Sequence, residues 1–513
     1  MKFYLPADLD LEQHYAENPP FERFSKDKMV VILSNIITIP IHNKNLVIEQ
    51  GFVPLSATVL KGMFTDYKRY LTYGLESGLL KSDKSYLKGF KCTGYKIALP
   101  YGKDLQTVSL KSLPLKRHYN KRYRVLENST KPYAFLNAWF AKGLEIDTYK
   151  AYAFLNAEFA LKMEYPALRD YEMRYDTTYY TPSGNKGDYR KVMKDPVLQY
   201  QQGVLSLQKL KEGEYSCHVD ATVKRYHSVL TNMRSPLRNY LTFKGEKMVS
   251  IDIKNSQPYL LCLLLQDGFW KSDKIVRPNA VRIKNTFLEG KKIEKPKILL
   301  SSLSNKFNNI LTIDILNIDK ESTYKDIDYF MLVKIRKTLV KTGFEAYVKE
   351  AVNGTLYDSL KPAFEAVMGY TINDRKELKK AMFQVLFTSN QFIGQDQAAP
   401  KRIFKKQYPE AYALCNAIKQ KDASLLPKLL QRIESHVMLT VIAKRLHKSY
   451  PKVPLFTVHD SILTTERNAQ LVAAVMQEEL SRCIGYSPTL AIEPLDPCVS
   501  EQKIETLKMK ATG

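Results

Sequence analysis

The chain has 513 residues, with 78 Lys and Arg against 53 Asp and Glu, and a formal net charge of +25 at pH 7. A hydrophobic content of 44% excludes wholesale disorder, and the length exceeds what one core of up to about 300 residues accommodates. The positive excess favours a polyanionic partner. Nucleic acid is the first candidate and an anionic membrane surface is the second.

Neither a membrane span nor a cysteine framework is predicted. The sequence has no run of about 18 apolar residues, the length that crosses a bilayer. Its first ten residues contain acidic side chains and no apolar stretch like that of a secretory signal. The six cysteines are scattered without a Cys-x-x-Cys pair, which argues against a zinc site or a disulfide network. We therefore expect a cytoplasmic protein with reduced thiols and no membrane partner.

The N-terminal 100 residues predict a winged-helix-like module. Residues 54–64 indicate a helix with Ser56 as its cap, and residues 65–80 indicate a second helix that Gly78 closes. The basic segment 81–99 then indicates a two-stranded ribbon. Side chains of the second helix that can face phosphates or bases are Lys68, Arg69, Tyr70 and Tyr73. A small packing module with a solvated basic face is the alternative.

The next region, 101–216, is rich in Tyr, Lys and Arg and has helical periodicity over 131–165. Aromatic side chains interleaved with cations suit a nucleic-acid groove, through stacking and cation–π contacts. The core of a helical domain explains the same pattern equally well.

Two aspartates stand at the ends of strand-like segments. Asp252 follows the apolar run 248–251, and Asp460 lies at the tip of a hairpin predicted by the runs 455–458 and 462–465. Capping or turn chemistry explains either residue alone. As a pair, two carboxylates can hold two Mg²⁺ ions, because substrate phosphates and waters supply the other oxygen ligands.

A third element is the helix predicted over 373–390. Four of its side chains, Arg375, Lys379, Phe383 and Phe387, recur every four residues. Each step drifts by only about 40° around the helix, so the four share one face. The cations can hold a triphosphate while the aromatic rings hold a sugar and a base. An amphipathic surface helix with a basic start is the alternative.

In this order, the three elements resemble the family A DNA polymerases and the related single-subunit phage-type RNA polymerases. Asp252 and Asp460 match the metal-binding aspartates of motifs A and C, and His459 matches the His that supports the primer end. The predicted helix matches the Arg-x3-Lys-x3-Phe-x3-Tyr pattern of the fingers helix, with Phe387 in the place of the usual Tyr.

Two further segments agree with this resemblance, which covers about residues 217–500. Within 221–238, three residues match the family side chains that line the primer–template: Arg225, Ser228 and Asn232. Within 429–439, Gln431 is the side chain expected to face the minor groove.

The resemblance implies an α+β, mostly helical fold: a right-hand polymerase of palm, fingers and thumb with an antiparallel palm sheet, preceded by the winged-helix-like module. The stretch 270–365 is longer than usual between motif A and the fingers helix, so we expect an inserted subdomain. The implied domains are 1–100, the N-terminal module; 101–216, a helical thumb-like, nucleic-acid-binding region; 217–269, palm with motif A; 270–400, fingers with the insertion and motif B; and 401–513, palm with motif C.

The sequence gives conflicting indications of whether the nucleotide substrate carries ribose or deoxyribose. Gln257 lies five residues after Asp252, where the DNA enzymes have a Glu that blocks ribose and the RNA enzymes have Gly. Because Gln is nearly isosteric with Glu, and because Phe387 lacks the hydroxyl that the RNA enzymes use, both residues favour dNTPs. Ser461 replaces the Glu that usually follows the motif C Asp, and it is commoner in the RNA enzymes.

The resemblance implies template-directed nucleotide addition to a 3′-hydroxyl in DNA replication, with Mg²⁺ (or Mn²⁺) as cofactor. The expected partners are a DNA primer–template or template DNA and dNTPs (or NTPs). Lys379 is the expected general acid for pyrophosphate, and Arg375 is expected to clamp the γ-phosphate. Glu145 and Asp147 do not suffice as an exonuclease site, so proofreading is not expected. A single-subunit RNA polymerase or primase, and a nucleic-acid-binding replication or regulatory protein with an inactive core, are the alternatives.

Overall fold

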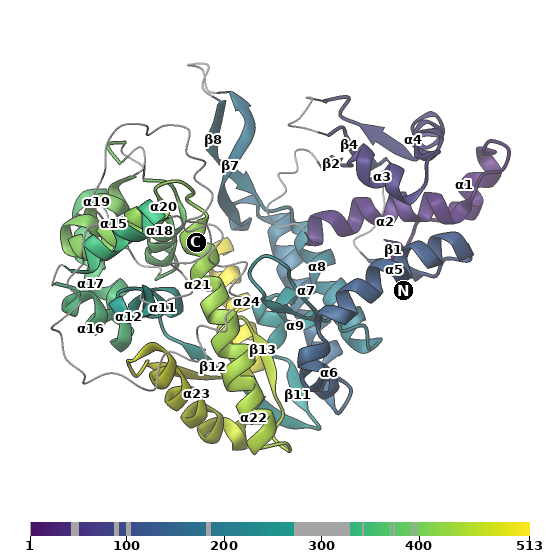
Figure 1. Cartoon of the computed structure of the whole chain (residues 1–513). Coiled ribbons are helices and arrows are strands. Elements are labelled where there is room, and N and C mark those ends of the chain that lie inside the picture. The colour runs from purple at the N-terminus through teal and green to yellow at the C-terminus, as the bar shows by residue number, and fades with distance from the viewer. Residues whose placement is uncertain are drawn as a thin grey trace, which may run out of the picture. The chain divides into compact units, whose positions relative to one another are not determined.

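The protein is a mostly helical α+β chain whose sheets pair antiparallel strands (Figure 1). The computed structural model describes residues 2–42, 51–86, 92–98, 104–180, 186–270, 329–340, 343–369, 371–372, 375–390, 393–395 and 398–512. Two compact units divide the chain: the first comprises 1–218, 227–248 and 494–513, and the second comprises 219–226 and 249–493. Among the helices in the described ranges, none combines the length and the apolar character that a bilayer span requires.

The first unit begins with strand β1 (Phe3–Pro6), which pairs with β5 (Leu105–Val108), and helix α1 (Leu11–Glu17). The segment between α1 and β5 confirms the predicted order of helix, helix and ribbon. That segment consists of α2 (Lys26–His42), β2 (Val53–Pro54), α3 (Ala57–Met63), α4 (Tyr67–Glu76), β3 (Leu80–Ser82) and β4 (Gly94–Ile97). Ser56 caps α3 by accepting a hydrogen bond from the Val59 amide at 3.4 Å. The three strands form one sheet in the order β2-β4-β3.

The inner face of α4 is aromatic, and here one expectation is wrong. Tyr70 and Tyr73 do not face outward. Tyr70 is fully buried, with its ring 5.0 Å from that of Phe24 and its hydroxyl accepting from the Ser25 amide at 2.9 Å. The Tyr73 hydroxyl donates to the Asn18 carbonyl at 2.6 Å. A large ring gains more by leaving water in this cluster than by standing exposed on a helix.

The rest of the first unit is built on helices α5 (Leu113–Ser129), α6 (Ala134–Phe140), α7 (Thr148–Glu164), α8 (Pro196–Lys211) and α24 (Pro497–Thr512). The helical prediction for 131–165 is only partly right. After α6, Gly143 adopts φ +135°, and the chain enters strand β6 (Leu144–Ile146), which pairs with β11 (Leu241–Phe243). Smaller elements are η1 (Lys131–Tyr133), η2 (Pro166–Leu168), β7 (Tyr171–Tyr180), β8 (Lys186–Met193), α9 (Val229–Asn232) and α10 (Ser235–Arg238).

A buried carboxylate ties three segments of the first unit together. Glu158 on α7 lies 2.6 Å from Arg234, 2.8 Å from Lys503 of α24 and 3.2 Å from Lys162. Burial opposes the charge of Glu158, but the three cations outweigh it and lower the pKa of this carboxyl to about 2. The C-terminal helix is therefore held by ion pairs as well as by packing.

The second unit carries the strands that hold both candidate aspartates. The two-residue strands β9 (His218–Val219) and β10 (Tyr226–His227) flank its short segment 219–226. Strand β12 (Glu246–Ile253) leads into the unit and is followed by α11 (Ser256–Leu264) and α12 (Asp267–Trp270). The hairpin of β13 (Phe456–Val458) and β14 (Ser461–Thr465) is confirmed, and β14 and β15 (Leu490–Pro494) are the neighbours of β12.

Helices form most of the second unit. In chain order they are α15 (Tyr329–Leu339), α16 (Glu345–Asn353), α17 (Leu356–Met368), α18 (Arg375–Phe387), α19 (Ala399–Gln407), α20 (Pro409–Lys419), α21 (Leu425–Ser435), the π-helical η5 (His436–Ala443), α22 (Lys444–Ser449), η6 (Glu466–Asn468) and α23 (Ala469–Ile484). Helix α18 confirms the helix predicted over 373–390. Of the expected insertion, 271–328 lies outside the described residues. The domain limits predicted at 100, 216, 269 and 400 stay predictions.

Candidate functional site

The structure brings Asp252 and Asp460 together in the second unit. Asp252 is on β12, and Asp460 is in the two-residue turn that precedes the neighbouring strand β14. His459 occupies the other turn position with φ +57°, the left-handed conformation that tight hairpins need. Both aspartates and His459 are half-buried. Two carboxylates that are remote in sequence thus meet, one on β12 and one in the turn before the neighbouring strand.

Their proximity shows in the electrostatics of Asp252. Burial raises the pKa of this carboxyl most, and the charge of Asp460 raises it further. Glu493 on β15 adds a third, weaker negative contribution. Hydrogen bonds from Ser461 and from Ser250, whose hydroxyl donates to Asp252 Oδ2 at 3.0 Å, act in the opposite direction. Repelling acids held this way favour a cation between them.

The donor set fits a hard divalent cation. Within the described residues no three His, Cys, Asp or Glu side chains gather as a ready-made metal site. Asp252 and Asp460 offer carboxylate oxygens only, which are the ligands of Mg²⁺ and Mn²⁺ rather than of softer metals. A metal pair here depends on further oxygens from water and substrate phosphates.

A buried ionic network lies next to the aspartates. Glu434 on α21 is 2% exposed and accepts two hydrogen bonds from Arg225, from Nε at 2.9 Å and from Nη2 at 2.8 Å. Gln257, at the start of α11, donates its Nε2 to Glu434 Oε2 at 2.5 Å. Gln257 is itself buried, so its amide is held in one orientation by Glu434.

Glu434 is also coupled to the carboxylate pair. Burial raises the pKa of Glu434 to about 7, although the Arg225 guanidinium lowers it, and the charge of Asp460 adds to the increase. Arg225 is fixed from its own side too, because its amide donates to Asp220 at 2.8 Å. The network therefore joins the segment 219–226, α21, α11 and the hairpin.

Helix α18 presents its four predicted side chains as a connected row. The Lys379 ammonium lies 5.6 Å from the Phe383 ring centre, and the rings of Phe383 and Phe387 stack in parallel 5.1 Å apart. Arg375 is exposed and donates to the Gly354 carbonyl at 3.2 Å. Arg375 and Lys379 are accessible to an anion at the N-terminal half of the helix, and the rings follow them.

Tyr357 on α17 connects this helix with the aspartates. The Arg375 guanidinium lies 5.7 Å from its ring centre. Burial raises the pKa of Tyr357 to about 12, while the charge of Arg375 lowers it and that of Asp460 raises it. Tyr357 thus lies within electrostatic reach of both Arg375 and Asp460.

The remaining predicted residues are distributed differently. Ser228 and Asn232 belong to the first unit, whereas Arg225 belongs to the second. Ser228 is fully buried and caps α9 in a reciprocal pair with Thr231, so its hydroxyl is engaged within the protein. Gln431 is half-buried on α21. Contact with nucleic acid stays a prediction for Ser228, Asn232 and Gln431.

Sequence reasoning missed three side chains of the site: Glu434, Tyr357 and Glu493. One signal for Glu434 was available, because it stands in the apolar stretch 429–439, three residues after Gln431. A carboxylate in such a stretch needs a buried partner. No comparable signal marks Tyr357 or Glu493.

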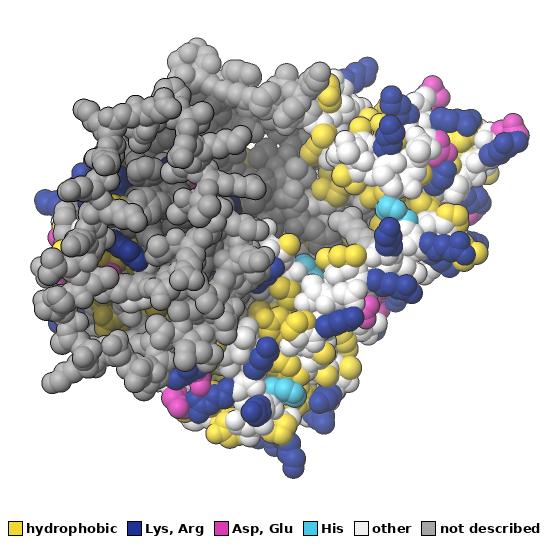
Figure 2. Space-filling model, in the orientation of Figure 1, with side chains coloured by type: hydrophobic (Ala, Val, Ile, Leu, Met, Phe, Trp, Pro, Cys, Tyr) yellow, Lys and Arg dark blue, Asp and Glu magenta, His cyan; other side chains and the backbone are white. Residues whose placement is uncertain are grey.

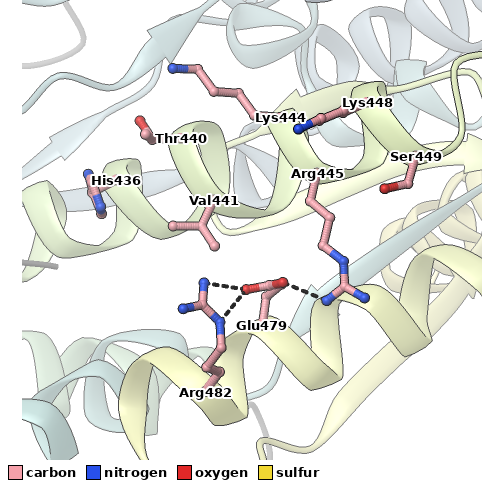
Figure 3. A pocket seen from close by; sticks show the side chains of 9 residues that line it. All are labelled: His436, Thr440, Val441, Lys444, Arg445, Lys448, Ser449, Glu479 and Arg482. Carbon is pink, nitrogen blue, oxygen red and sulfur yellow. Dashed lines mark hydrogen bonds and ion pairs between the residues drawn. The ribbon is translucent and has the colours of Figure 1, made fainter. Parts of the chain in front are cut away.

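A polar pocket of the second unit, with a volume of about 380 Å³, lies between α23 and the continuous helical segment of η5 and α22. Figure 3 shows Arg445 and Arg482 pointing toward Glu479, at 2.5 Å and 2.7 Å, while Lys444 extends away from it. Glu478 also pairs with Arg445 at 2.7 Å. Carboxylates of α23 thus engage the two arginines, and the Arg445 ion pairs chiefly hold α22 against α23.

Comparisons with known proteins find a faint likeness to solved structures. No protein-family model and no curated protein matches the chain. Among solved structures, the chain is similar to the POL domain of Pol1 from M. smegmatis in complex with DNA primer-template and dNTP. The TM-score is 0.28 at 10% identity, covering 74% of this chain and 72% of that chain. A likeness at this level carries no weight for function, which is inferred below from the side chains.

Proposed function

We propose that the protein is a template-directed nucleic-acid polymerase that adds nucleotides to a 3′-hydroxyl. One observation carries the proposal: Asp252 on β12 and Asp460 in the turn before the neighbouring strand β14, 208 positions apart by their numbers (460 − 252), come together in the fold. Tyr357 links them to the exposed cations of α18. Paired carboxylates beside a cationic and aromatic helix are what phosphoryl transfer to a nucleotide needs.

In this mechanism Asp252 and Asp460 hold two Mg²⁺ ions (or Mn²⁺), which neutralise charge at the reacting phosphate when bound. Arg375 binds the γ-phosphate of the incoming nucleotide, and Lys379 gives a proton to the leaving pyrophosphate. Phe383 and Phe387 stack against the base and sugar. These residues position the α-phosphate in line with the 3′-oxygen, and positioning supplies much of the rate in such reactions.

Deoxynucleotides are the favoured substrates. Gln257 is buried and held by Glu434, so its side chain cannot easily rotate to admit a 2′-hydroxyl. This supports a DNA-directed DNA polymerase acting on a DNA primer–template. An RNA polymerase or primase is the second candidate, because Ser461 stands where the DNA enzymes have Glu. The Ser461 hydroxyl donates to the Val458 carbonyl at 2.8 Å.

We assign the palm to strands β12–β15, the fingers to the helices around α18, and a thumb-like role to the helical part of the first unit. The first hundred residues form a winged-helix-like module in this proposal. Its support is the order helix, strand, helix, helix, ribbon, with the sheet ordered β2-β4-β3.

Primer extension with the purified full chain tests the proposal. Asp252→Asn and Asp460→Asn are compared with Asp422→Asn, a matched control at an exposed loop carboxylate. We expect both site variants to lose at least about 1,000-fold in extension rate while retaining primer–template binding, because only the reaction needs the charge pair. The control should extend normally.

Separate dNTP and NTP pools, each with and without a primer, identify the substrate in the same assay. Extension of a primer with dNTPs supports the DNA polymerase, and unprimed synthesis with NTPs supports the primase or RNA polymerase. Binding without any incorporation, with Mg²⁺ or Mn²⁺, indicates a nucleic-acid-binding protein with an inactive core. Normal extension by either site variant refutes the assignment of the aspartates.

A further inference from the structure

Helices α3 and α4 of the first unit have the order and the short connection of a helix-turn-helix. Three residues, 64–66, join them, and the ribbon of β3 and β4 follows α4 directly. A Cβ atom on Gly74 would lie 2.7 Å from Leu80 Cδ1, so α4 approaches β3 as closely as a glycine allows. The buried Tyr70 and Tyr73 then fix which side of α4 faces outward. Helix α4 is therefore packed on β3 by one side, and its opposite side faces outward.

The outer face of α4 is polar and basic at its N-terminal half. Lys68, Arg69 and Thr72 are exposed there. The Arg69 guanidinium lies 4.2 Å from the centre of the Phe21 ring, so its plane is held by a cation–π contact while its N–H groups stay available at the edge. These side chains line an open groove of about 490 Å³, and Glu76 is the acidic residue at its far end.

The ribbon beside α4 adds further positive charge. Lys81 is exposed on β3, and Tyr86 is 67% exposed beyond it. Asp83 is occupied in shaping the turn, because it accepts hydrogen bonds from the Ser85 and Gly94 amides at 3.0 Å and 2.9 Å. From residue 55 to residue 97 the sequence has eight Lys and Arg against three Asp and Glu. In Figure 2, Lys and Arg side chains lie around α3 and α4, interspersed with Asp and Glu.

We propose that this N-terminal module binds duplex DNA, with α4 in the major groove and the β3–β4 ribbon along the neighbouring backbone. The major groove of B-form DNA admits an α-helix, and Lys68, Arg69 and Thr72 reach phosphates and base edges from it. A-form RNA has a deep, narrow major groove that excludes a helix. The proposal concerns the first unit and is independent of the polymerase assignment.

The test uses the full chain and a closed dumbbell duplex of about 24 base pairs, long enough for a helix-turn-helix footprint and lacking any 3′ end for a polymerase site. Binding is measured by fluorescence anisotropy from about 50 to 200 mM salt, where phosphate contacts dominate the affinity. The variant is the double substitution Lys68→Glu with Arg69→Glu. Its charge-matched control is Lys448→Glu with Lys452→Glu, two exposed lysines of the second unit on and just after α22.

We expect the module variant to bind at least about 10-fold more weakly, with a salt slope smaller by about 2, because two phosphate contacts are lost. The control should bind like the unchanged protein. Primer extension at saturating primer–template should survive in both, which also shows that the variant is folded. A milder pair, Lys68→Gln with Arg69→Gln, should give a smaller loss in the same direction.

Three results overturn the proposal. One is unchanged duplex binding by both module variants. Another is an equal loss in the control, which makes the effect one of net charge. The third is a preference of the unchanged protein for single-stranded DNA or duplex RNA over the dumbbell. Absence of primer extension in every variant would count against the polymerase assignment and leave this binding test readable.

Discussion

Replacing Glu434 by Gln perturbs the buried network at its centre. The change keeps the size of the side chain, removes the charge, and replaces one of the two oxygens that accept from Arg225 and Gln257 at 2.5–2.9 Å by an amide NH2. Because burial raises the pKa of Glu434 to about 7 from an ordinary value of 4.5, the folded protein takes up a proton that the unfolded chain has already released. The stability of the second unit should therefore depend on pH through this residue.

The sign and size follow from proton linkage. Between the two pKa values the folded state binds one proton more than the unfolded state, so the free energy of unfolding falls by about 1.4 kcal/mol for each pH unit of increase. From about pH 5 to about pH 7.5 the fall reaches about 2 kcal/mol. Glu434→Gln lacks this proton. The variant should gain about 2 kcal/mol relative to the unchanged protein over that interval, whatever their difference at pH 5.

The assay uses the two tryptophans of the chain, Trp139 in the first unit and Trp270 in the second. Fluorotryptophan labelling and ¹⁹F NMR follow urea unfolding of each unit separately, with Trp139→Phe to assign the signals. The Trp139 signal should show the same pH profile in both proteins and serves as the internal control. If the unfolding free energy followed at Trp270 depends on pH in the same way in the variant and in the unchanged protein, that result would falsify the linkage. A variant that loses stability relative to the unchanged protein as pH rises would show that the Arg225 pair outweighs burial.

Three further outcomes are expected. Gln257→Ala should raise the use of NTPs relative to dNTPs by roughly tenfold in single-nucleotide incorporation, because the held amide no longer crowds a 2′-hydroxyl; an unchanged ratio argues against a sugar gate. Arg375→Ala should raise the KM for nucleotide by about tenfold through loss of charge-assisted hydrogen bonds, whereas Arg402→Ala should not. Glu158→Gln should lower the free energy of unfolding of the first unit by about 3 kcal/mol near pH 7. The pKa of Glu158 is lowered to about 2 in the folded protein, so its charge adds stability at pH values above its ordinary pKa, and this stability is lost as the pH falls toward 2. The Trp139 signal in urea measures the difference, and a difference that does not depend on pH contradicts the prediction.

Local patterns in the sequence predicted the elements that carry the candidate site. The hairpin around Asp460 follows from two β runs separated by a polar turn, and α18 follows from its four-residue repeat of cations and aromatics. Ser56 was recognisable as a cap because its hydroxyl serves the first turn of its own helix. Each of these signals depends only on residues close together in the chain.

The errors arise where distant segments compete for the same side chain. Tyr70 and Tyr73 stand on a helix that also carries Lys68 and Arg69, and local spacing does not tell which face turns inward. Contacts with residues 18–25 decide this, because burying the rings against that segment removes their apolar surface from water. Strand β6 inside a helical pattern has a similar cause, since its partner β11 is about a hundred residues away in the sequence.

The sequence by itself therefore determined the residue types of the site, their order and the elements that hold them, since short-range periodicity and turn chemistry specify those features. Only the tertiary structure decided that Glu434 orients Gln257, that Arg225 compensates its buried charge, and that Tyr357 contacts Arg375 and feels the charge of Asp460. These relations join positions up to 209 residues apart. They come from the cost of burying a charge without a partner, which is met only once the chain has folded.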